Sequence, residues 1–301
     1  MKPRWTAADI PPQHGRIALV TGANRGLGFE IAAALAAAGA EVVLGCRDAD
    51  KAAAAVARIR ARHAQAKVAT MPLDLASLAS VRRFAAAFTK AHPRLDLLLH
   101  NAAAILAPRG RTADGFETHL GTNHLGPFAL TGLLLDRLAA APGARVIIAG
   151  SLAHRMTRGL DLTDPHGDRR AYDPMDAYGR SKLAALSHAF ELDRRLRAAG
   201  LPVRSLAAHP GYTATNDDLG GFWLRLTTKL IGQSPALGAL PALYAATAGQ
   251  ADGGDYYGPD GFAELRGHPR KVKARPEARD PAFAARLWAL SEQLTGVRYL
   301  S

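Results

Sequence analysis

A tyrosine and a lysine lie four residues apart in the segment Tyr178-Gly-Arg-Ser-Lys182. If this segment is helical, both side chains share one face of the helix. A phenol has a pKa of about 10, and a neighbouring ammonium group favours its ionised form. Lowering that pKa by about 2 units requires roughly 2.7 kcal/mol of differential stabilisation. The pair could therefore exchange a proton with an oxygen atom near neutral pH, although a pair at this spacing is weak evidence by itself.

A glycine-rich turn near the start of the chain could bind phosphate groups. It reads Thr21-Gly22-Ala-Asn24-Arg25-Gly26-Leu27-Gly28, directly after an apolar segment. Gly22 permits a tight turn, Gly26 lets backbone amides approach a pyrophosphate, and Gly28 lets the following helix pack closely. The helix N-terminus adds partial positive charge at the same place. An ordinary turn is the alternative interpretation.

Alternating strands and helices must position these groups. Short apolar runs predict strands over 16–21, 41–46, 67–71, 95–100, 145–150 and 203–208. Helical patterns predict helices over 26–38, 49–64, 77–91, 112–140 and 177–199, and an apolar stripe predicts a terminal helix around 283–294. This alternation indicates an α/β fold, namely a doubly wound, mostly parallel Rossmann-type sheet with helices on both faces.

No repeat or low-complexity linker divides the chain, so we expect one domain over residues 1–301. Residues 1–14 form an N-terminal extension and 265–301 a C-terminal extension. The polar segment 152–176 and the apolar-striped segment 213–234 are expected to be insertions on the substrate side, where α/β folds place ligands. An ordinary surface loop is the alternative for each insertion.

The glycine turn and the Tyr178–Lys182 pair together resemble the motifs of the short-chain dehydrogenases/reductases, and the resemblance extends from about residue 15 to 248. It implies a nicotinamide-dependent oxidoreductase. In that family Tyr178 would be the acid/base, and Lys182 would hydrogen-bond the nicotinamide ribose. Ser151 would hold the substrate oxygen, and Asn123 would help to position a proton-relay water.

The long interval between Ser151 and Tyr178 is similar to that of the retinol-dehydrogenase-like branch. The segments Leu44-Gly-Cys-Arg-Asp48 and Thr122-Asn-His-Leu-Gly126 show the same similarity. This branch reduces retinoids, steroids and other lipophilic carbonyls, so the resemblance implies a small lipophilic alcohol, aldehyde or ketone as substrate.

The end of the second predicted strand favours NADP(H) over NAD(H). An acid at this position would bind both ribose hydroxyls of NAD, but the strand ends in Cys46 and Arg47. Arg47 offers a donor fork to a phosphate, and Arg25 occupies another position that is basic in NADP-preferring relatives. Asp48 lies close enough that a shift in register would weaken this expectation.

The resemblance also implies further cofactor contacts. Asp74, followed by Leu75, would accept from the adenine amino group, with capping of the next helix as the alternative. Asn101, Ala102 and Ala103 would line the adenosine side, although His100 and Ala103 depart from the family's Asn-Asn-Ala-Gly. After the sixth strand, the implied nicotinamide contacts are Pro210, Gly211, Thr213 and Thr215. His209 is expected to be structural.

Composition limits the other classes of protein. Hydrophobic residues make up 48% and charged residues 21%, which argues against general disorder. Cys46 is the single cysteine, no signal peptide or transmembrane run is evident, and no metal site is expected, so we expect a cytoplasmic protein. The net charge of +12 attracts phosphate, but the densest basic run, 266–275, has no interleaved aromatic residues, so no nucleic-acid binding is expected.

Two other functions remain open at this point: a non-catalytic NADP-binding redox sensor, and a nucleic-acid or membrane-surface protein attracted by charge. A homodimer or homotetramer is also possible, since many relatives pair through their long helices.

Overall fold

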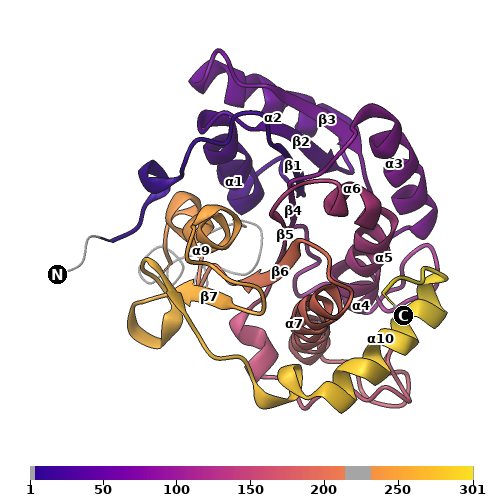
Figure 1. Ribbon diagram of the computed structural model, residues 1–301. Helices are drawn as coiled ribbons and strands as arrows, with labels where there is room; N and C mark the ends of the chain where they lie inside the picture. The colour runs from indigo at the N-terminus through magenta and orange to yellow at the C-terminus, as the bar shows by residue number, and fades with distance from the viewer. Residues whose placement is uncertain (1–3, 214–231, 301) are drawn as a thin grey trace.

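A computed structural model describes residues 4–213 and 232–300 of the chain, and one eight-stranded sheet runs through its centre (Figure 1). The sheet order is β3-β2-β1-β4-β5-β6-β7-β8, and every neighbouring pair is parallel except the antiparallel pair β7–β8. The strands are β1 (Ile17–Thr21), β2 (Glu41–Cys46), β3 (Val68–Pro72), β4 (Leu97–His100), β5 (Ala144–Ala149), β6 (Val203–Ala208), β7 (Tyr256–Pro259) and β8 (Pro269–Lys271).

The central strands are apolar because both of their faces are covered. All five residues of β1 are buried, and alternate side chains enter two separate cores. Leu19 packs in one core, whereas Ala18 and Val20 pack in the other. This alternation follows from the two-residue period of a strand.

The larger helices form a layer on each face of this sheet. On one face lie α1 (Gly26–Ala37), α2 (Ala49–Arg62) and α9 (Pro235–Thr247). On the other lie α3 (Leu78–Ala91), α5 (Gly126–Leu133) and α7 (Pro174–Ala198), as Figure 1 shows. The strand order reverses between β1 and β4, and helices cover both faces, so the doubly wound α/β fold expected from the sequence is confirmed.

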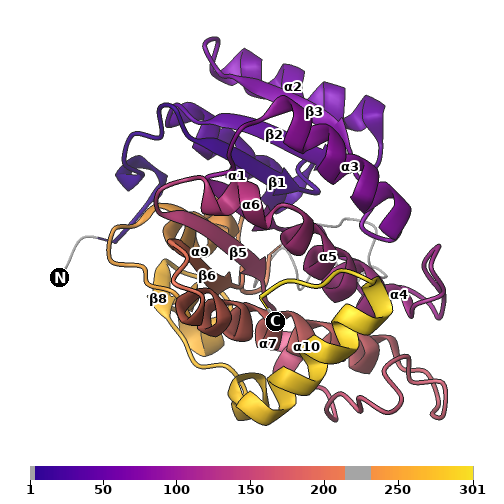
Figure 2. The ribbon, with the colours of Figure 1, turned by 45° about the vertical axis from the view of Figure 1, so that its right-hand side comes forward.

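The C-terminal segment packs on the outside of the second layer. Helix α10 (Pro281–Thr295) lies against α7 (Figure 2), and its buried residues Phe283, Leu287 and Trp288 belong to the core of that face. The remaining short elements are η1 (Ala7–Asp9), α4 (Thr118–Leu120), the π-helical turn η2 (Gly121–Leu125), α6 (Leu135–Ala139), η3 (Leu152–Arg155), η4 (Phe262–Glu264) and η5 (Pro276–Arg279).

The structure differs from the sequence-based expectation in one predicted helix and in three further elements. The helix expected over 112–140 begins only at Thr118, because Gly115 adopts φ +83° in a turn, and it is interrupted at Leu134 between α5 and α6. Helix α9 and the strands β7 and β8 were not predicted. None of the helices in the described ranges is long and apolar enough to cross a bilayer.

Candidate active site

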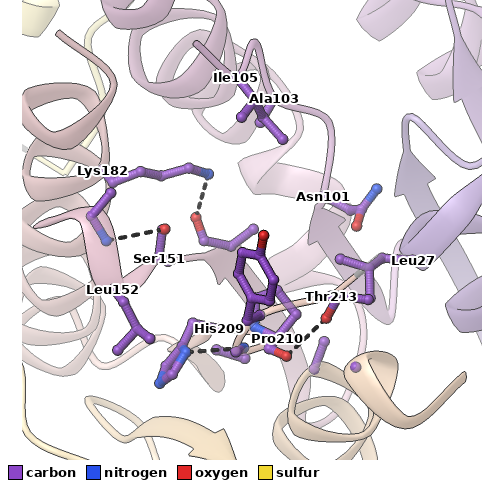
Figure 3. Close-up of a pocket in the computed structure, with 18 of the residues that line it drawn as sticks. Leu27, Asn101, Ala103, Ile105, Ser151, Leu152, Lys182, His209, Pro210 and Thr213 are labelled. Carbon is purple, nitrogen blue, oxygen red and sulfur yellow. Dashed lines mark hydrogen bonds between the residues drawn. The ribbon is translucent and has the colours of Figure 1, made fainter. Parts of the chain in front are cut away.

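A cavity of about 520 Å³ opens where the carboxyl ends of β4, β5 and β6 meet. The register aligns His100 with Ile148 and Ala149 with Ala208, so the residues that follow these strands converge. Figure 3 shows Ser151 and Lys182 on one side of this cavity and Asn101 and Leu27 on the opposite side. The site therefore lies at the carboxyl edge of the sheet, where open α/β folds bind ligands.

Helix α7 presents Tyr178 and Lys182 to the cavity. The helix begins after Asp173, whose carboxylate accepts hydrogen bonds from the amides of Met175 and Asp176. One turn further, Gly179 faces η3, and a Cβ there would lie 2.7 Å from the carbonyl oxygen of Ala153. The missing side chain lets α7 approach the end of β5 closely, which brings Tyr178 beside Ser151.

Ser151 lies two residues beyond the end of β5 and caps η3. Its Oγ accepts from the amide of Ala153 at 3.2 Å. Burial raises the pKa of the Tyr178 phenol, and a hydrogen bond with the Ser151 side chain offsets this only in part. The phenol is therefore protonated at neutral pH in this structure.

Lys182 follows Tyr178 by one turn of α7 and is also buried. Its Nζ donates to the carbonyl oxygen of Ala149 at 2.9 Å and lies 5.8 Å from the centroid of the Tyr178 ring. Burial lowers the pKa of Lys182 to about 8. The expected lowering of the Tyr178 pKa by this lysine is not seen, because burial of the phenol dominates.

The glycine turn is packed as the sequence indicates. Gly22 has φ +67°, and a Cβ there would lie 2.8 Å from the Cβ of Ala102. A Cβ at Gly28 would lie 2.5 Å from Nδ2 of Asn101. Asn101 Nδ2 also donates to the carbonyl oxygen of Thr21 at 3.1 Å, which joins the turn to the end of β4.

Comparisons with known proteins agree with this geometry. The family model of the short chain dehydrogenase matches residues 16–162. The chain is 39% identical to retinol dehydrogenase 13 of Mus musculus, over 96% of this chain and 86% of that protein. It is 42% identical to polyprenol dehydrogenase of Mus musculus, over 95% and 86%. The chain belongs to the short-chain dehydrogenase family.

Solved structures of the family share the fold. An uncharacterised protein of Mycobacterium Paratuberculosis is 42% identical, with a TM-score of 0.83 and 99% of both chains covered. The active-site complex of Pseudomonas aeruginosa RhlG with NADP is 29% identical, with a TM-score of 0.64, and covers 81% of this chain and 94% of that one. The resemblance to the short-chain dehydrogenases, and to their retinol-dehydrogenase-like branch, is thus confirmed.

Asn123, the fourth residue of the family's catalytic set, is buried in the π-helical turn η2. Its Oδ1 accepts from the amide of Ala104 at 2.8 Å, and its Nδ2 donates to the Ala104 carbonyl and to Ser181 Oγ, both at 2.9 Å. Asn123 does not line the cavity, whereas the other three residues of the set do. Its side chain therefore fixes neighbouring backbone, and a π turn is a common irregularity at functional sites.

The expected adenosine end of the site is polar and exposed. Arg25 and Arg47 are exposed, and neither guanidinium has a side-chain partner among residues 4–213 and 232–300. Asp48 caps α2 instead, with Oδ1 accepting from the Lys51 amide at 3.0 Å. The thiol of Cys46 lies against the backbone amides of Ala23 and Asn24, so β2 ends beside the glycine turn.

The remaining expected cofactor residues lie along the same edge of the sheet. Asp74 Oδ1 accepts from the Ala76 amide at 2.9 Å, and Ser77 rather than Asp74 caps α3. Leu75 is buried beside Gly126, where a Cβ would lie 2.3 Å from the Leu75 carbonyl oxygen. The expected residues that line the cavity are Leu27, Asn101, Ala103, Ser151, Tyr178, Lys182, Pro210, Gly211 and Thr213.

Residues 209–213 form the side of the cavity near α9. His209 is buried, its Nδ1 accepts from the Gly211 amide at 3.2 Å, and its Nε2 lies 3.0 Å from Glu264 Oε2. Both ring nitrogens are thus engaged within the protein, in line with a structural role. Thr213 Oγ1 donates to the carbonyl of Pro210 at 3.0 Å. Thr215 lies outside the described residues.

Several residues of the cavity were missed by the sequence analysis. They are apolar side chains, and they include Ile105, Leu106 and Leu265, whereas Met156 and Met175 lie in the 152–176 insertion that was expected on the substrate side. Met156 is 65% exposed and Met175 37% exposed, so the apolar lining continues to the surface. No local pattern marks these residues, because only the tertiary fold brings them together.

Proposed function

We propose that the protein is an NADP(H)-dependent oxidoreductase that interconverts lipophilic alcohols and their carbonyl compounds. One observation supports this most strongly: Ser151, Tyr178 and Lys182 face one cavity whose remaining lining is mostly apolar. Membership of the short-chain dehydrogenase family supports the same reaction class.

The chain fits a nicotinamide coenzyme. The glycine turn at 21–28 leads into the N-terminus of the twelve-residue helix α1, whose partial positive charge favours phosphate. Leu27, Asn101 and Pro210 would border the coenzyme on the cavity side. When bound, the nicotinamide supplies or accepts the hydride.

The proton is assigned to Tyr178. Because burial raises its pKa, the phenol keeps its proton at neutral pH and can donate it to a carbonyl oxygen. The Ser151 hydroxyl would hydrogen-bond the same oxygen and orient it. The Lys182 ammonium would stabilise the phenolate that remains after proton transfer. This arrangement can supply the proton that carbonyl reduction requires.

The lining favours a lipophilic substrate. Leu106, Leu152, Met156 and Leu265 border the cavity. Charged substrates would lose hydration there without gaining a compensating partner from these side chains. Two relatives are named for retinol and polyprenol, both lipophilic alcohols, which supports the same substrate class.

Replacing the acid tests the mechanism. Tyr178→Phe removes only the hydroxyl group, so kcat for reduction of a lipophilic aldehyde should fall by about 100- to 10,000-fold. The dissociation constant of NADPH should stay within about twofold, because the ring remains in place. Steady-state assays measure kcat, and a fluorescence titration measures the dissociation constant of NADPH. Turnover by the variant at the wild-type rate would refute the assignment.

Replacing Arg47 tests the coenzyme. Its guanidinium is exposed at the end of β2, where a 2′-phosphate would lie, and Asp48 is engaged with α2. Arg47→Ala should weaken NADPH about tenfold or more and leave NADH within about twofold. Arg58→Ala is the control, since Arg58, on α2, packs over the ring of Phe29 on α1. Equal affinity of the wild type for NADPH and NADH would contradict the proposal.

A further inference from the structure

Leu106 lines the cavity in an unfavourable backbone conformation. It has φ +49°, one of the few non-glycine residues with positive φ among the described residues. A bulky residue such as leucine is unfavourable in this left-handed conformation, so the surrounding structure must hold Leu106 in it. Such outliers concentrate at ligand sites. The question is therefore what holds Leu106 there and what it contacts.

The segment 104–107 is held at its first residue by Asn123. Both backbone groups of Ala104 are bonded to this one amide: its N–H donates to Oδ1 at 2.8 Å, and its carbonyl accepts from Nδ2 at 2.9 Å. Asn123 is buried and also bonded to Ser181, so it cannot follow a movement of the segment.

The last residue of the segment is held in the same manner by two other side chains. The Ala107 amide donates to His119 Nε2 at 3.0 Å, and the Ala107 carbonyl accepts from the Tyr172 hydroxyl at 3.0 Å. The side chains come from α4 and from the 152–176 insertion. Between the two fixed ends, Ile105 and Leu106 both border the cavity, and Figure 3 shows Ile105 on its upper side.

A buried carboxylate fixes the histidine. Glu117 Oε1 lies 2.8 Å from His119 Nδ1, and its two oxygens also accept from the amides of His119 and Leu120. Since Nε2 accepts from Ala107, the proton of His119 resides on Nδ1 and is donated to Glu117. The same imidazole packs edge-on against the Tyr178 ring at 6.0 Å between centroids. His119 therefore contacts both the 104–107 segment and the ring of the proposed acid, Tyr178.

We propose that Leu106 is a specificity-determining residue, which together with Ile105 forms a rigid wall against the apolar portion of a lipophilic substrate. His119 and Tyr172 are positioning residues that hold this wall at a fixed distance from Tyr178. The inference rests on the proposed function, since it assigns the substrate's apolar portion to one side of the same cavity.

The first test compares a short and a long straight-chain aldehyde, butanal and decanal, with saturating NADPH. The wild type should prefer decanal, because its longer chain buries more apolar surface against the lining that includes the wall. Leu106→Ala should lower kcat/KM for decanal about tenfold and leave butanal within about twofold. An unchanged ratio of decanal to butanal would overturn the proposal.

A second variant separates positioning from packing. Tyr172→Phe removes the hydroxyl that holds Ala107 and keeps the ring, so KM for decanal should rise about threefold or more while kcat and the KM for NADPH stay within about twofold. Tyr257→Phe is the matched control: it removes a hydroxyl that donates to Asp255 Oδ2 at 2.7 Å on β7. Equal effects of the two variants on KM for decanal would count against the positioning role.

A binding measurement distinguishes failure of this inference from failure of the proposed function. If the wild type reduces neither aldehyde, the proposed function fails. Competition of butanol and decanol with anilinonaphthalene sulfonate still tests the wall, because it needs no turnover. Leu106→Ala should then reduce the preference for decanol about tenfold, and an unchanged preference would overturn the wall independently of catalysis.

Discussion

At the scale of single residues, the site depends on two ionisable groups that burial shifts in opposite directions. Burial disfavours the charged form of each group. It raises the pKa of the Tyr178 phenol and lowers the pKa of the Lys182 ammonium to about 8. Tyr178 thus stays protonated as a proton donor, and Lys182 is the group of the pair that loses its proton first as pH rises.

The pH profile of the enzyme should therefore report Lys182. A positive charge on Nζ stabilises the phenolate formed during reduction, and this charge is lost above a pH of about 8. We expect kcat/KM for NADPH, which reports the free enzyme, to be level near neutrality and to fall above about pH 8 with unit slope. Initial rates in buffers of constant ionic strength measure this profile.

Lys182→Arg is the matched variant, because a guanidinium keeps its charge throughout this range. Its absolute rate should be lower, since a planar fork does not match the contact of Nζ with Ala149. Its decrease above about pH 8 should nevertheless disappear. A decrease at the same pH in both proteins would assign the titration to another group.

At the scale of elements, the close approach of α7 to η3 positions the proposed catalytic residues. Gly179 permits this approach, since a Cβ there would lie 2.7 Å from the Ala153 carbonyl oxygen. Gly179→Ala should destabilise the fold by about 1–3 kcal/mol, despite the better helix propensity of alanine. It should also lower kcat about tenfold or more, because α7 must shift Tyr178 away from Ser151. Urea unfolding and steady-state kinetics measure both effects.

Gly249→Ala provides the control for this variant. Gly249 follows α9, and a Cβ there meets nothing within 4 Å. The substitution should change neither stability nor kcat appreciably. If Gly179→Ala behaved in the same way, the contact between α7 and η3 would not position Tyr178.

The same scale shows which parts of the structure the sequence could predict. Strands β1 and β4 are buried at every position and mostly apolar, so their pattern was sufficient. Helix α9 contains Pro241 and is apolar on all sides, which hides a helical period. β7 ends in Gly258 and Pro259 and pairs with β6 through only two residues, so its position depends on tertiary contacts.

The candidate site follows the same rule. The residues that line the cavity directly after strands, such as Ser151 and Asn101, occur in recognisable motifs, so the sequence predicted them. The support of the 104–107 segment could not be predicted, because Tyr172 and His119 meet at Ala107 from distant parts of the chain. Hydrogen bonds from side chains to loop backbone leave no periodic pattern in a sequence.

At the scale of the whole molecule, buried histidines connect the sheet, α7 and the C-terminal segment. Each imidazole pairs through Nε2 with a hydroxyl group; the pairs are His100–Thr131, His124–Ser291 and His188–Tyr299. Ser291 lies on α10 and Tyr299 in the terminal segment, so two of the pairs attach the C-terminus to the core. Burial lowers the pKa of each ring, to about 3 for His100 and for His124.

These histidines should make the protein sensitive to acid. Each ring is neutral in the folded state but has a pKa of about 6.5 when unfolded, so below that value the unfolded state binds more protons. The contribution of these rings to stability is therefore complete above about pH 6.5 and declines as pH falls toward 3.

At about pH 4.5 each of His100 and His124 should lower the unfolding free energy by roughly 3 kcal/mol. His124→Gln should remove the contribution of His124 to the pH dependence of the unfolding free energy. Urea titrations from neutral pH to about pH 4.5 measure this dependence. His63→Gln, at an exposed position, is the control and should leave it unchanged. Parallel curves for the wild type and His124→Gln would mean that the ring is protonated in the folded state, and the C-terminal segment would then have to separate from α5 and α7 before the rest of the chain unfolds.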